Sequence, residues 1–417
     1  MSRFYYIIIC LFLGLGITFV SFFNGFGGWN GELDNSETQY PPIESGKGRI
    51  ILDLEVVPEK IITREIVDNF LIGVGTIDVP GTCASPSALK DLRINGINYF
   101  LPYTQWESIE REKGHYRKDP CPGEDAIAWL DKTGATMNGH CLIFFINFSV
   151  PSFVADYSFS EQKKMIEKYV KTTVKNFPGI EIWTLNEPIA QNYLNWSREQ
   201  AYDVFVSVSK WIHETNPEAK VMINMIPIKC DWGGLDYEPK EVMDDLIDRG
   251  LEADIIGIEL YYWWAEEEVD ENGYPKLDWI KSKVDIFRKY NLPIIFSELG
   301  VPGVMGEKEQ WIEQADWMEE VFRYLHDDED VIGAVWYFVR DHEFMPYAGL
   351  MNDNYTYRPV AKRLIEIANE WNPSTMHNLN GQKYLDLDPG ECDVIVNQEI
   401  FRVSIVEGQT VMIAGED

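Results

Sequence analysis

Eight short apolar runs rich in β-branched residues recur along this chain, and they limit its fold more than any other feature does. The runs span residues 70–77, 97–103, 136–145, 180–185, 220–226, 254–262, 293–299 and 332–338. Amphipathic segments with helical spacing lie between them, for example residues 160–177, 197–215, 239–250 and 309–328. Strands that alternate with helices form parallel β-α units, and eight units close most naturally into a barrel. We therefore predict an α/β fold, a (β/α)8 TIM barrel, over residues 61–374.

The main alternative is an open, doubly wound parallel sheet. Such a sheet usually carries a glycine-rich phosphate loop after its first strand. The corresponding stretch here, GVGTIDVPG at residues 73–81, lacks the G-x-G-x-x-G spacing. The barrel is therefore the preferred fold.

The segments that flank the predicted barrel have a different character. Residues 4–23 contain no charge and are long enough to span a bilayer, so we interpret residues 1–26 as a signal peptide or membrane anchor. No A-x-A-like cleavage pattern follows, which favours an anchor, and Arg3 places the amino terminus in the cytoplasm. Residues 27–60 are polar and contain proline, which predicts a linker and lead-in. The helical pattern then stops near the carboxyl end, and residues 375–417 predict a small β appendage.

The balance of charges restricts the partners of this chain. Its 36 basic and 68 acidic residues give a net charge of −32, which repels nucleic-acid phosphates and anionic lipid head groups. We therefore expect no nucleic-acid partner. We expect a monomer that is extracellular, either secreted or anchored to the outer side of the cytoplasmic membrane.

Cysteine usage points to no metal chemistry. Beyond Cys10 in the apolar segment, the remaining cysteines form no C-x-x-C pair, so the sequence predicts neither a metal site nor a cofactor. Cys83 and Cys121 lie in loops containing proline and glycine, where either a disulfide or free thiols would fit.

Two glutamates stand at the ends of two predicted strands. Glu187 directly follows the fourth run, and Glu298 closes the seventh. Active sites of TIM barrels lie at the carboxyl ends of the strands, so the two carboxylates are expected to face each other across the barrel mouth. Such a pair can cleave a glycosidic bond, because one carboxylic acid protonates the leaving oxygen while the other stabilises or attacks the anomeric carbon. Asn186, directly before Glu187, can bond a sugar 2-hydroxyl.

A single glutamate at a strand end more often makes a structural hydrogen bond. Two of them, on the fourth and seventh strands of an eight-strand pattern and one of them preceded by asparagine, favour the catalytic interpretation.

Four sequence motifs resemble those of a known protein family. YTQWESIEREKGHY (103–116), AIAWLDKTGATMNGHCLIFF (126–145), VPSFV (150–154) and IWTLNEP (182–188) occur in that order. They resemble the second to fourth strands of glycoside hydrolase family 10, the xylanases among the retaining (β/α)8 glycosidases, over residues 65–370. The resemblance implies that Glu187 is the general acid/base and Glu298 the nucleophile. It further implies that His140 and Trp336 bind the sugar at the cleaved bond and that Trp106 contributes to the neighbouring subsites, although a structural histidine and a core tryptophan are the alternatives.

The sequence also departs from the family pattern. Leu101, Pro102 and Gln105 replace a Glu-Asn pair and a lysine that hold xylose, which makes the sugar specificity an open question. On strand six, Glu259 and Tyr261 replace a glutamine and a histidine. Tyr261 is expected to bond the nucleophile, whereas Glu259 either raises the pKa of a neighbouring carboxyl or points elsewhere.

Aromatic residues at strand ends are the last candidates. Trp263 and Trp264 follow strand six, where they either stack on sugar rings or fill the core.

Together these features predict a retaining glycoside hydrolase that cleaves a β-1,4-linked polysaccharide or oligosaccharide, with xylan as the first choice. A β-glucanase, β-mannanase or exo-β-glycosidase of the same clan is the alternative, as is a barrel that binds glycans without cleaving them.

Overall fold

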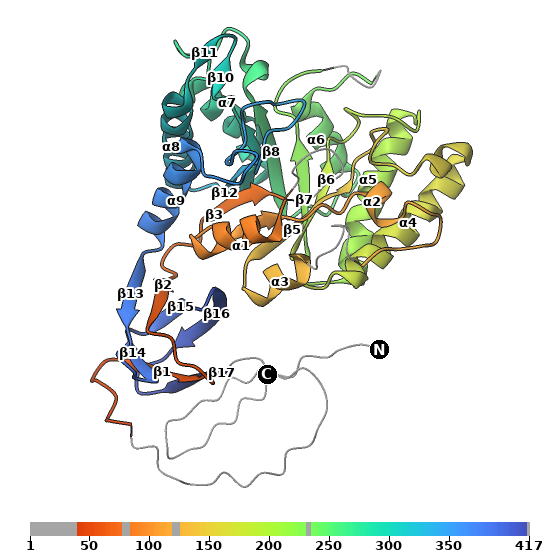
Figure 1. The fold of residues 1–417 in the computed structure, drawn as a ribbon. Coiled ribbons are helices and arrows are strands. Elements are labelled where there is room, and N and C mark those ends of the chain that lie inside the picture. Colours follow the sequence, from red (N-terminus) through yellow and green to blue (C-terminus); the bar gives the residue numbers. More distant parts are fainter. Residues whose placement is uncertain (1–39, 77–83, 119–125, 231–234, 415–417) are drawn as a thin grey trace. The chain divides into compact units, whose positions relative to one another are not determined.

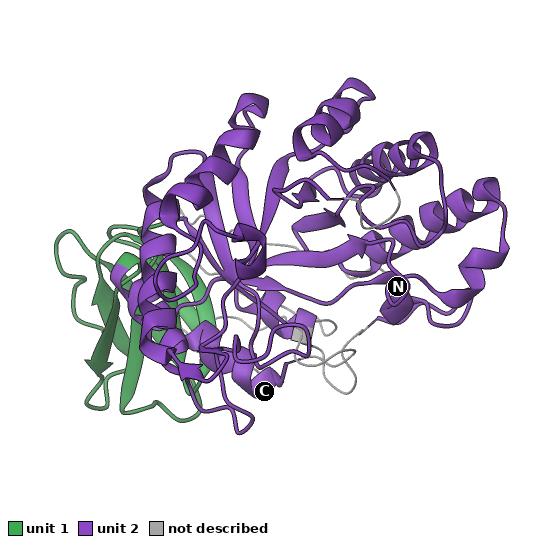
Figure 2. Ribbon diagram, turned by 90° about the horizontal axis from the view of Figure 1, so that it is seen from above, with its two compact units in different colours: residues 1–68, 371–417 green, residues 69–370 purple. Residues whose placement is uncertain are grey.

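The computed structural model describes residues 40–76, 84–118, 126–230 and 235–414, which fall into two compact units. One unit is Asn69–Glu370, and the other joins the chain before it, Met1–Asp68, to the chain after it, Trp371–Asp417 (Figure 2). The predicted anchor and the pair Cys83 and Cys121 lie outside the described residues. Within the described ranges, no helix is long and apolar enough to cross a membrane.

The larger unit contains a closed barrel of eight parallel strands, which confirms the predicted fold (Figure 1). Around the barrel the order is β12-β3-β4-β5-β6-β7-β8-β9. The strands are β3 (Leu71–Gly75), β4 (Tyr99–Leu101), β5 (Thr136–Ile143), β6 (Ile182–Asn186), β7 (Lys220–Met225), β8 (Ile255–Tyr261), β9 (Ile294–Gly300) and β12 (Val331–Trp336). Each apolar run in the sequence therefore overlaps one barrel strand, and three of the strands extend one residue beyond their run.

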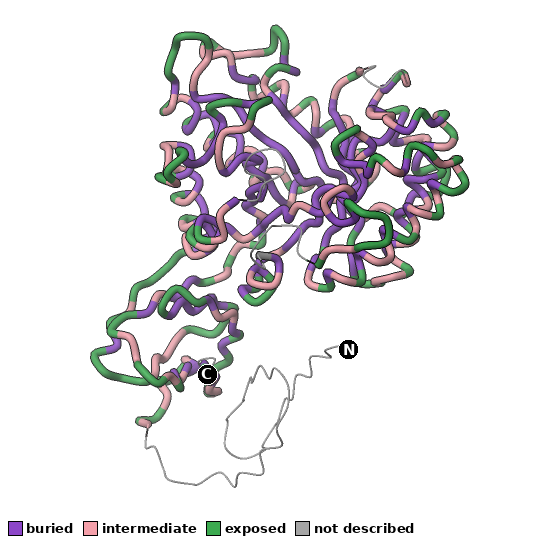
Figure 3. The backbone as a smooth tube through the Cα atoms, turned by 45° about the vertical axis from the view of Figure 1, so that its right-hand side comes forward, coloured by how far each residue is buried: buried purple, intermediate pink, exposed green. Residues whose placement is uncertain are grey.

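The barrel strands are continuous apolar runs because both of their faces are covered. Every residue of β6, β8 and β9 is buried, and Figure 3 shows the strands buried while the helices keep exposed outer faces. Parallel sheets in α/β proteins are covered by helices on one side and by barrel side chains on the other, which removes the polar alternation of a half-exposed strand.

Helices connect the strands, and their boundaries follow local sequence signals. They are α1 (Pro86–Ile94), α2 (Trp106–Ile109), α3 (Ala126–Lys132), α4 (Phe159–Asn176), α5 (Arg198–Thr215), α6 (Pro239–Asp248), α7 (Leu277–Phe287), α8 (Trp311–Asp327) and α9 (Pro359–Trp371), with short 3₁₀ turns η1 (Ser152–Asp156), η2 (Tyr262–Ala265) and η3 (Arg288–Tyr290) and a hairpin of β10 (Val304–Met305) and β11 (Lys308–Glu309). Ser158 and Ser197 begin α4 and α5 as capping boxes, in which the side chain three residues later bonds back to the serine N–H.

The described residues of the smaller unit form two sheets. One sheet has the order β14-β1-β17 and the other β13-β2-β15-β16. The strands are β1 (Gly48–Asp53), β2 (Lys60–Glu65), β13 (Ser374–Asn378), β14 (Tyr384–Leu387), β15 (Gly390–Val396), β16 (Glu399–Ile405) and β17 (Thr410–Ala414). Its core is aliphatic and includes Ile50, Leu52, Val394 and Ile413.

The prediction of a linker over residues 27–60 is wrong from Gly48 onward. Residues 48–53 form β1, which pairs in parallel with β17 and antiparallel with β14. The alternating apolar residues of β1 are buried only because strands from the far end of the chain cover them. A local pattern contains no information about such a distant partner.

Candidate active site

The carboxyl ends of four barrel strands bring three glutamates together. Glu187 follows β6, Glu259 belongs to β8 and Glu298 to β9, and their exposed fractions are 8%, 2% and 5%. Glu259 and Glu298 are direct neighbours in the register of β8 and β9. Asn224 of β7 lies between these elements and bonds to two of the carboxyls. The closed barrel therefore assembles a buried acidic cluster at the place where the sequence predicted a pair.

Glu187 is held at the start of the loop after β6. Its backbone φ is 44°, in the left-handed region, and its N–H donates to the Asn224 carbonyl at 3.0 Å. Its carboxyl accepts only long contacts, from Gln191 Nε2 at 3.3 Å and from Asn186 Nδ2 at 3.4 Å. Burial, followed by the nearby charge of Glu298, raises the pKa of Glu187 to about 8. A group in this state is protonated at neutral pH.

Glu298 also accepts two hydrogen bonds, but one of them comes from a hydroxyl. The Tyr261 hydroxyl donates to Oε2, and Asn224 Nδ2 donates to Oε1 at 3.4 Å. His140 Nε2 also lies 3.0 Å from Oε1, close enough for an ion pair, although the ring is turned so that it forms no hydrogen bond. Glu298 therefore differs from Glu187 in receiving a hydroxyl donor and in having an imidazole beside it.

The orientation of the Asn224 amide is fixed by its other partners. Ser297 Oγ donates to Asn224 Oδ1, so the NH2 group faces the acids. That nitrogen donates to Glu259 Oε1 at 2.8 Å and to the side-chain oxygen of Asn186. Gly257 of β8 is the register neighbour of Asn224 of β7 and leaves space for its amide. A Cβ at position 257 would lie 2.3 Å from Asn224 Oδ1.

The structure answers where Glu259 points. It faces into the acidic cluster rather than away from it. Burial, then the charges of Glu298 and Glu187, raises the pKa of Glu259 well above its ordinary value.

Aromatic side chains from the end of β8 and from the loop after β12 pack together beside the cluster. Tyr261 stacks on Trp263 with ring centroids 4.8 Å apart and an interplanar angle of 10°. Phe344, from the loop after β12, packs edge-on against Tyr261 at 5.6 Å and Trp263 at 6.0 Å. Trp263 and Phe344 remain 39% and 48% exposed, whereas Trp264 is 8% exposed. The two exposed rings are accessible for stacking on a sugar, and Trp264 belongs to the core.

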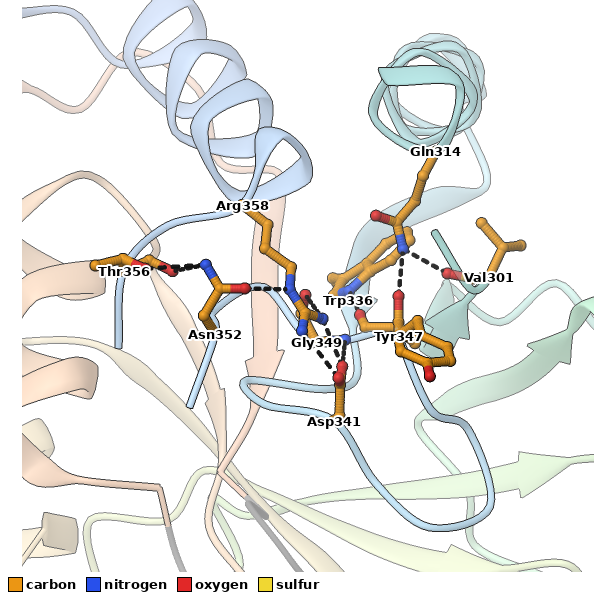
Figure 4. A network of polar contacts seen from close by, with 10 residues as sticks. Val301, Gln314, Trp336, Asp341, Tyr347, Gly349, Asn352, Thr356 and Arg358 are labelled. Carbon is orange, nitrogen blue, oxygen red and sulfur yellow. Dashed lines mark hydrogen bonds and ion pairs between the residues drawn. The ribbon is translucent and has the colours of Figure 1, made fainter. Parts of the chain in front are cut away.

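Trp336 and the loop after β12 are held by a polar network (Figure 4). The Trp336 indole N–H donates to the Ala348 carbonyl at 2.7 Å, and the ring is fully buried. Arg358 and Asp341 form an ion pair in the same loop, and Asp341 Oδ1 accepts the Gly349 N–H at 3.0 Å. A Cβ at position 349 would lie 2.5 Å from the Arg340 carbonyl carbon, so this tight loop requires glycine. The loop that carries Phe344 is thereby fixed against the barrel.

The contacts of Trp106 are with residues outside the acidic cluster. Its ring stacks on Tyr169 at 5.0 Å, and its indole N–H donates to Glu110 Oε2 at 2.8 Å. It is 2% exposed. This packing is that of a core tryptophan supporting the loop after β4.

Several contributing residues had weak or no sequence signals. Ser297 and Gln191 are ordinary polar residues beside the two glutamates, and Phe344 lies in a loop with no strand pattern around it. The positions of Ser297 and Gln191, one before Glu298 and four after Glu187, were the only available hints. Among the described residues, no group of His, Cys, Asp and Glu side chains has the arrangement of a metal site.

Comparison with known proteins gives a consistent result. The sequence pattern of glycosyl hydrolase family 10 matches residues 98–366. Endo-1,4-beta-xylanase B of Thermotoga neapolitana is 21% identical over 329 residues, which cover 74% of this chain and 91% of that protein. Anti-sigma-I factor RsgI6 of Acetivibrio thermocellus is 22% identical over 311 residues, which cover 72% of this chain and 38% of that protein.

Solved structures share the fold. Xylanase 10B from Thermotoga maritima superposes with a TM-score of 0.56 at 18% identity, covering 72% of this chain and 95% of that one. Xylanase 10B from Thermotoga petrophila, solved with xylobiose, has a TM-score of 0.55 at 19% identity and covers 72% and 94% of the two chains.

Proposed function

Since the chain belongs to glycosyl hydrolase family 10, we propose that it cleaves β-1,4-linked polysaccharide, xylan first, with retention of anomeric configuration. It is a glycoside hydrolase similar to endo-1,4-β-xylanases. We assign Glu187 as acid/base and Glu298 as nucleophile. The observation that carries this assignment is the unequal bonding of the two carboxyls, of which only Glu298 receives a hydroxyl donor and has an imidazole beside it.

In the first step, Glu187 begins protonated and gives its proton to the glycosidic oxygen as the bond to the anomeric carbon breaks. A carboxylate oxygen of Glu298 attacks that carbon from the opposite face, which yields a covalent glycosyl ester and releases the shortened chain. The high pKa of Glu187, about 8, supports its role as the proton donor.

In the second step, Glu187 is a carboxylate and takes a proton from water. The water oxygen attacks the anomeric carbon, the bond to Glu298 breaks with its electron pair returning to the carboxylate, and Glu187 is protonated again. Two inversions give net retention.

Two neighbouring residues are available to bind the sugar. Both ring nitrogens of His140 are buried and have no hydrogen-bond partner among the described residues, although Nε2 faces Glu298, which supports a role in binding substrate hydroxyls. Asn186 lies beside Glu187, with its Nδ2 in a long 3.4 Å contact to that carboxyl and its Oδ1 accepting from Asn224, which supports a role for this amide in binding a sugar 2-hydroxyl.

A second candidate specificity within the clan is favoured by the subsite next to the cleaved bond. Leu101 is 1% exposed and offers no polar group, and the amide oxygen of Gln105 already accepts from the hydroxyls of Tyr103 and Ser149. The contacts that the family uses for xylose are therefore missing here, which supports a β-glucan or β-mannan as the competing substrate.

Product analysis tests both substrate choices. The purified protein is incubated with xylan, mannan, mixed-linkage glucan and cellulose, and the released oligosaccharides are followed by NMR. We expect xylo-oligosaccharides that appear first as the β-anomer. Release from another polymer would move the specificity to the second candidate, and first appearance of the α-anomer would exclude retention.

We propose in addition that the enzyme acts outside the cell, secreted or anchored. The support is the uncharged stretch at residues 4–23, which is long enough for a bilayer. Fractionation of cells that express the full chain should place it in the membrane or the medium, and recovery from the cytosol would contradict the proposal.

A further inference from the structure

Three carboxyl groups share one buried cluster, although the proposed reaction uses two. The third is Glu259, which is 2% exposed and stands beside Glu298 in the strand register. What this extra acid does is a question that the proposed function leaves open. The inference below rests on that function.

The Asn224 amide has fewer hydrogens than there are acceptor oxygens around it. Its nitrogen approaches oxygens of Glu259, Glu298 and Asn186, but an amide carries only two hydrogens. Glu259 Oε1, at 2.8 Å, is closer than Glu298 Oε1, at 3.4 Å. Glu259 therefore takes the better share and sets the position of the amide between the strands.

The cluster cannot hold several negative charges at once. The polar partners of the three acids are amides, one hydroxyl and one imidazole, and among the described residues no lysine or arginine is paired with them. Unscreened like charges in a buried site repel strongly, so most of the acids in such a group keep their protons. Glu259 is the least exposed of the three, at 2%, and stands directly beside Glu298, so a charge on Glu259 would lie next to another carboxyl with no cationic partner in the described part of the chain.

We propose that Glu259 is a positioning residue that works as a neutral carboxylic acid, holding the Asn224 amide in place while the single negative charge of the cluster stays on Glu298 or, after the first step, on Glu187. The total charge of the cluster is then −1 throughout the cycle. The raised pKa of Glu259 agrees with this state. Titratable groups that interact electrostatically with it come from several elements: Glu298 on β9, Glu187 after β6, Tyr261 on β8, Cys141 on β5, Tyr337 after β12, and Cys230 and Tyr237 after β7.

Two variants distinguish a role of Glu259 as a neutral hydrogen-bond acceptor from a role in filling space. Glu259→Gln keeps a neutral group with an acceptor oxygen, whereas Glu259→Leu keeps only an apolar side chain of similar size. We expect the Gln variant to lose no more than about threefold in kcat/KM, because the bond to Asn224 is retained. The kcat/KM of the Leu variant should fall about 10–100-fold, which is the usual effect of removing a contact that supports an active-site residue. Equal losses in the two variants, or a near-complete loss in Gln, would overturn the proposal.

Thermal unfolding provides a readout that does not require activity. An acid whose pKa is raised by folding keeps its proton in the folded chain after the unfolded chain has lost it, so the folded state loses stability as pH rises. The Glu259→Gln variant does not have this pH-dependent loss of stability. The Tm of the variant minus the Tm of the wild-type protein should therefore rise from about pH 5 to about pH 8. Glu309→Gln, on the exposed hairpin strand β11, is the matched control and should show no such rise.

The two readouts distinguish different failures. A Tm difference that levels off by about pH 6 would mean that Glu259 ionises like an ordinary carboxyl, and it would overturn the proposal whatever the activity. A rising Tm difference in a protein that cleaves none of the glycans would instead contradict the proposed function, while the neutral state of Glu259 would stand.

Discussion

The ends of β6 and β9 present the same side chain in the same barrel, but they surround it differently. At β6, Glu187 accepts only two amide contacts of 3.3 and 3.4 Å. At β9, Glu298 accepts the Tyr261 hydroxyl and the Asn224 amide and faces the His140 imidazole. Two chemically identical side chains therefore have different hydrogen-bond partners, and the proposed division of roles between them follows from these neighbours more than from their place at a strand end.

The largest expected effect comes from removing the charge at β9. Glu298→Gln should lower kcat/KM on the order of 10⁴-fold or more, because the amide cannot form the glycosyl ester. Steady-state kinetics on the preferred polysaccharide gives the value, and circular dichroism checks the fold. A variant that keeps a tenth of the activity would remove Glu298 as nucleophile.

Removing the proton donor at β6 should cost less. Glu187→Gln is expected to lose about 10²–10⁴-fold on polysaccharide, the usual contribution of general acid catalysis. The loss in the bond-cleaving step should nearly vanish with a dinitrophenyl glycoside, whose leaving group needs no proton. Pre-steady-state release of dinitrophenolate measures this step. An equal loss on both substrates would contradict the assignment of Glu187 as acid.

The hydroxyl donor is the feature that most clearly separates the two ends. Tyr261→Phe removes the bond to Glu298 and keeps the ring that stacks on Trp263. We expect kcat/KM to fall about 10–100-fold. The matched control is Tyr290→Phe, whose hydroxyl bonds the Lys240 carbonyl and the Asp244 carboxylate away from the cluster, and it should retain full activity. Similar losses in both variants would deny a special role for Tyr261.

The smallest effects are the changes in activity and stability with pH that follow from the titration of Glu187. Since burial and Glu298 raise the pKa of Glu187 to about 8, kcat/KM should decline above about pH 8 as the acid loses its proton. The same shift affects stability. Folding raises this pKa, so the stabilisation is complete below the unfolded value near 4.5 and is lost as pH rises towards 8.

Thermal unfolding of Glu187→Gln measures that loss directly. The Tm of the variant should exceed that of the wild-type protein by a margin that grows between about pH 5 and pH 8. A margin that stays constant over this range would mean that Glu187 ionises in the folded enzyme as an ordinary carboxyl does.

The sequence predicts the barrel well because its strands are buried on both faces. Each of the eight apolar runs overlaps a strand, and Glu187 and Glu298 stand at strand ends as predicted. The bonding between them was not predictable, because Asn224 and Ser297 meet only when the barrel closes. Glu259 is the clearest case, since its direction depends on the register between β8 and β9.

Two regions show where local patterns mislead. Trp106 belongs to a motif that resembles a sugar-binding segment, yet its ring stacks on Tyr169 and its indole bonds Glu110. Residues 48–53 have the polar surroundings of a linker, yet β17 provides a partner from the other end of the chain. In both cases tertiary packing, which is absent from the local sequence, determines the outcome.

Trapping of the covalent intermediate shows directly which carboxylate attacks the anomeric carbon. The protein is treated with a 2-deoxy-2-fluoro glycoside of the preferred sugar, which slows hydrolysis of the glycosyl ester, and the modified peptide is identified by mass spectrometry. We expect one sugar per chain, attached to Glu298, with inactivation in step with labelling. Attachment to Glu187 or Glu259, or turnover of the natural substrate with inversion and no labelling, would contradict the assignment of Glu298 as nucleophile.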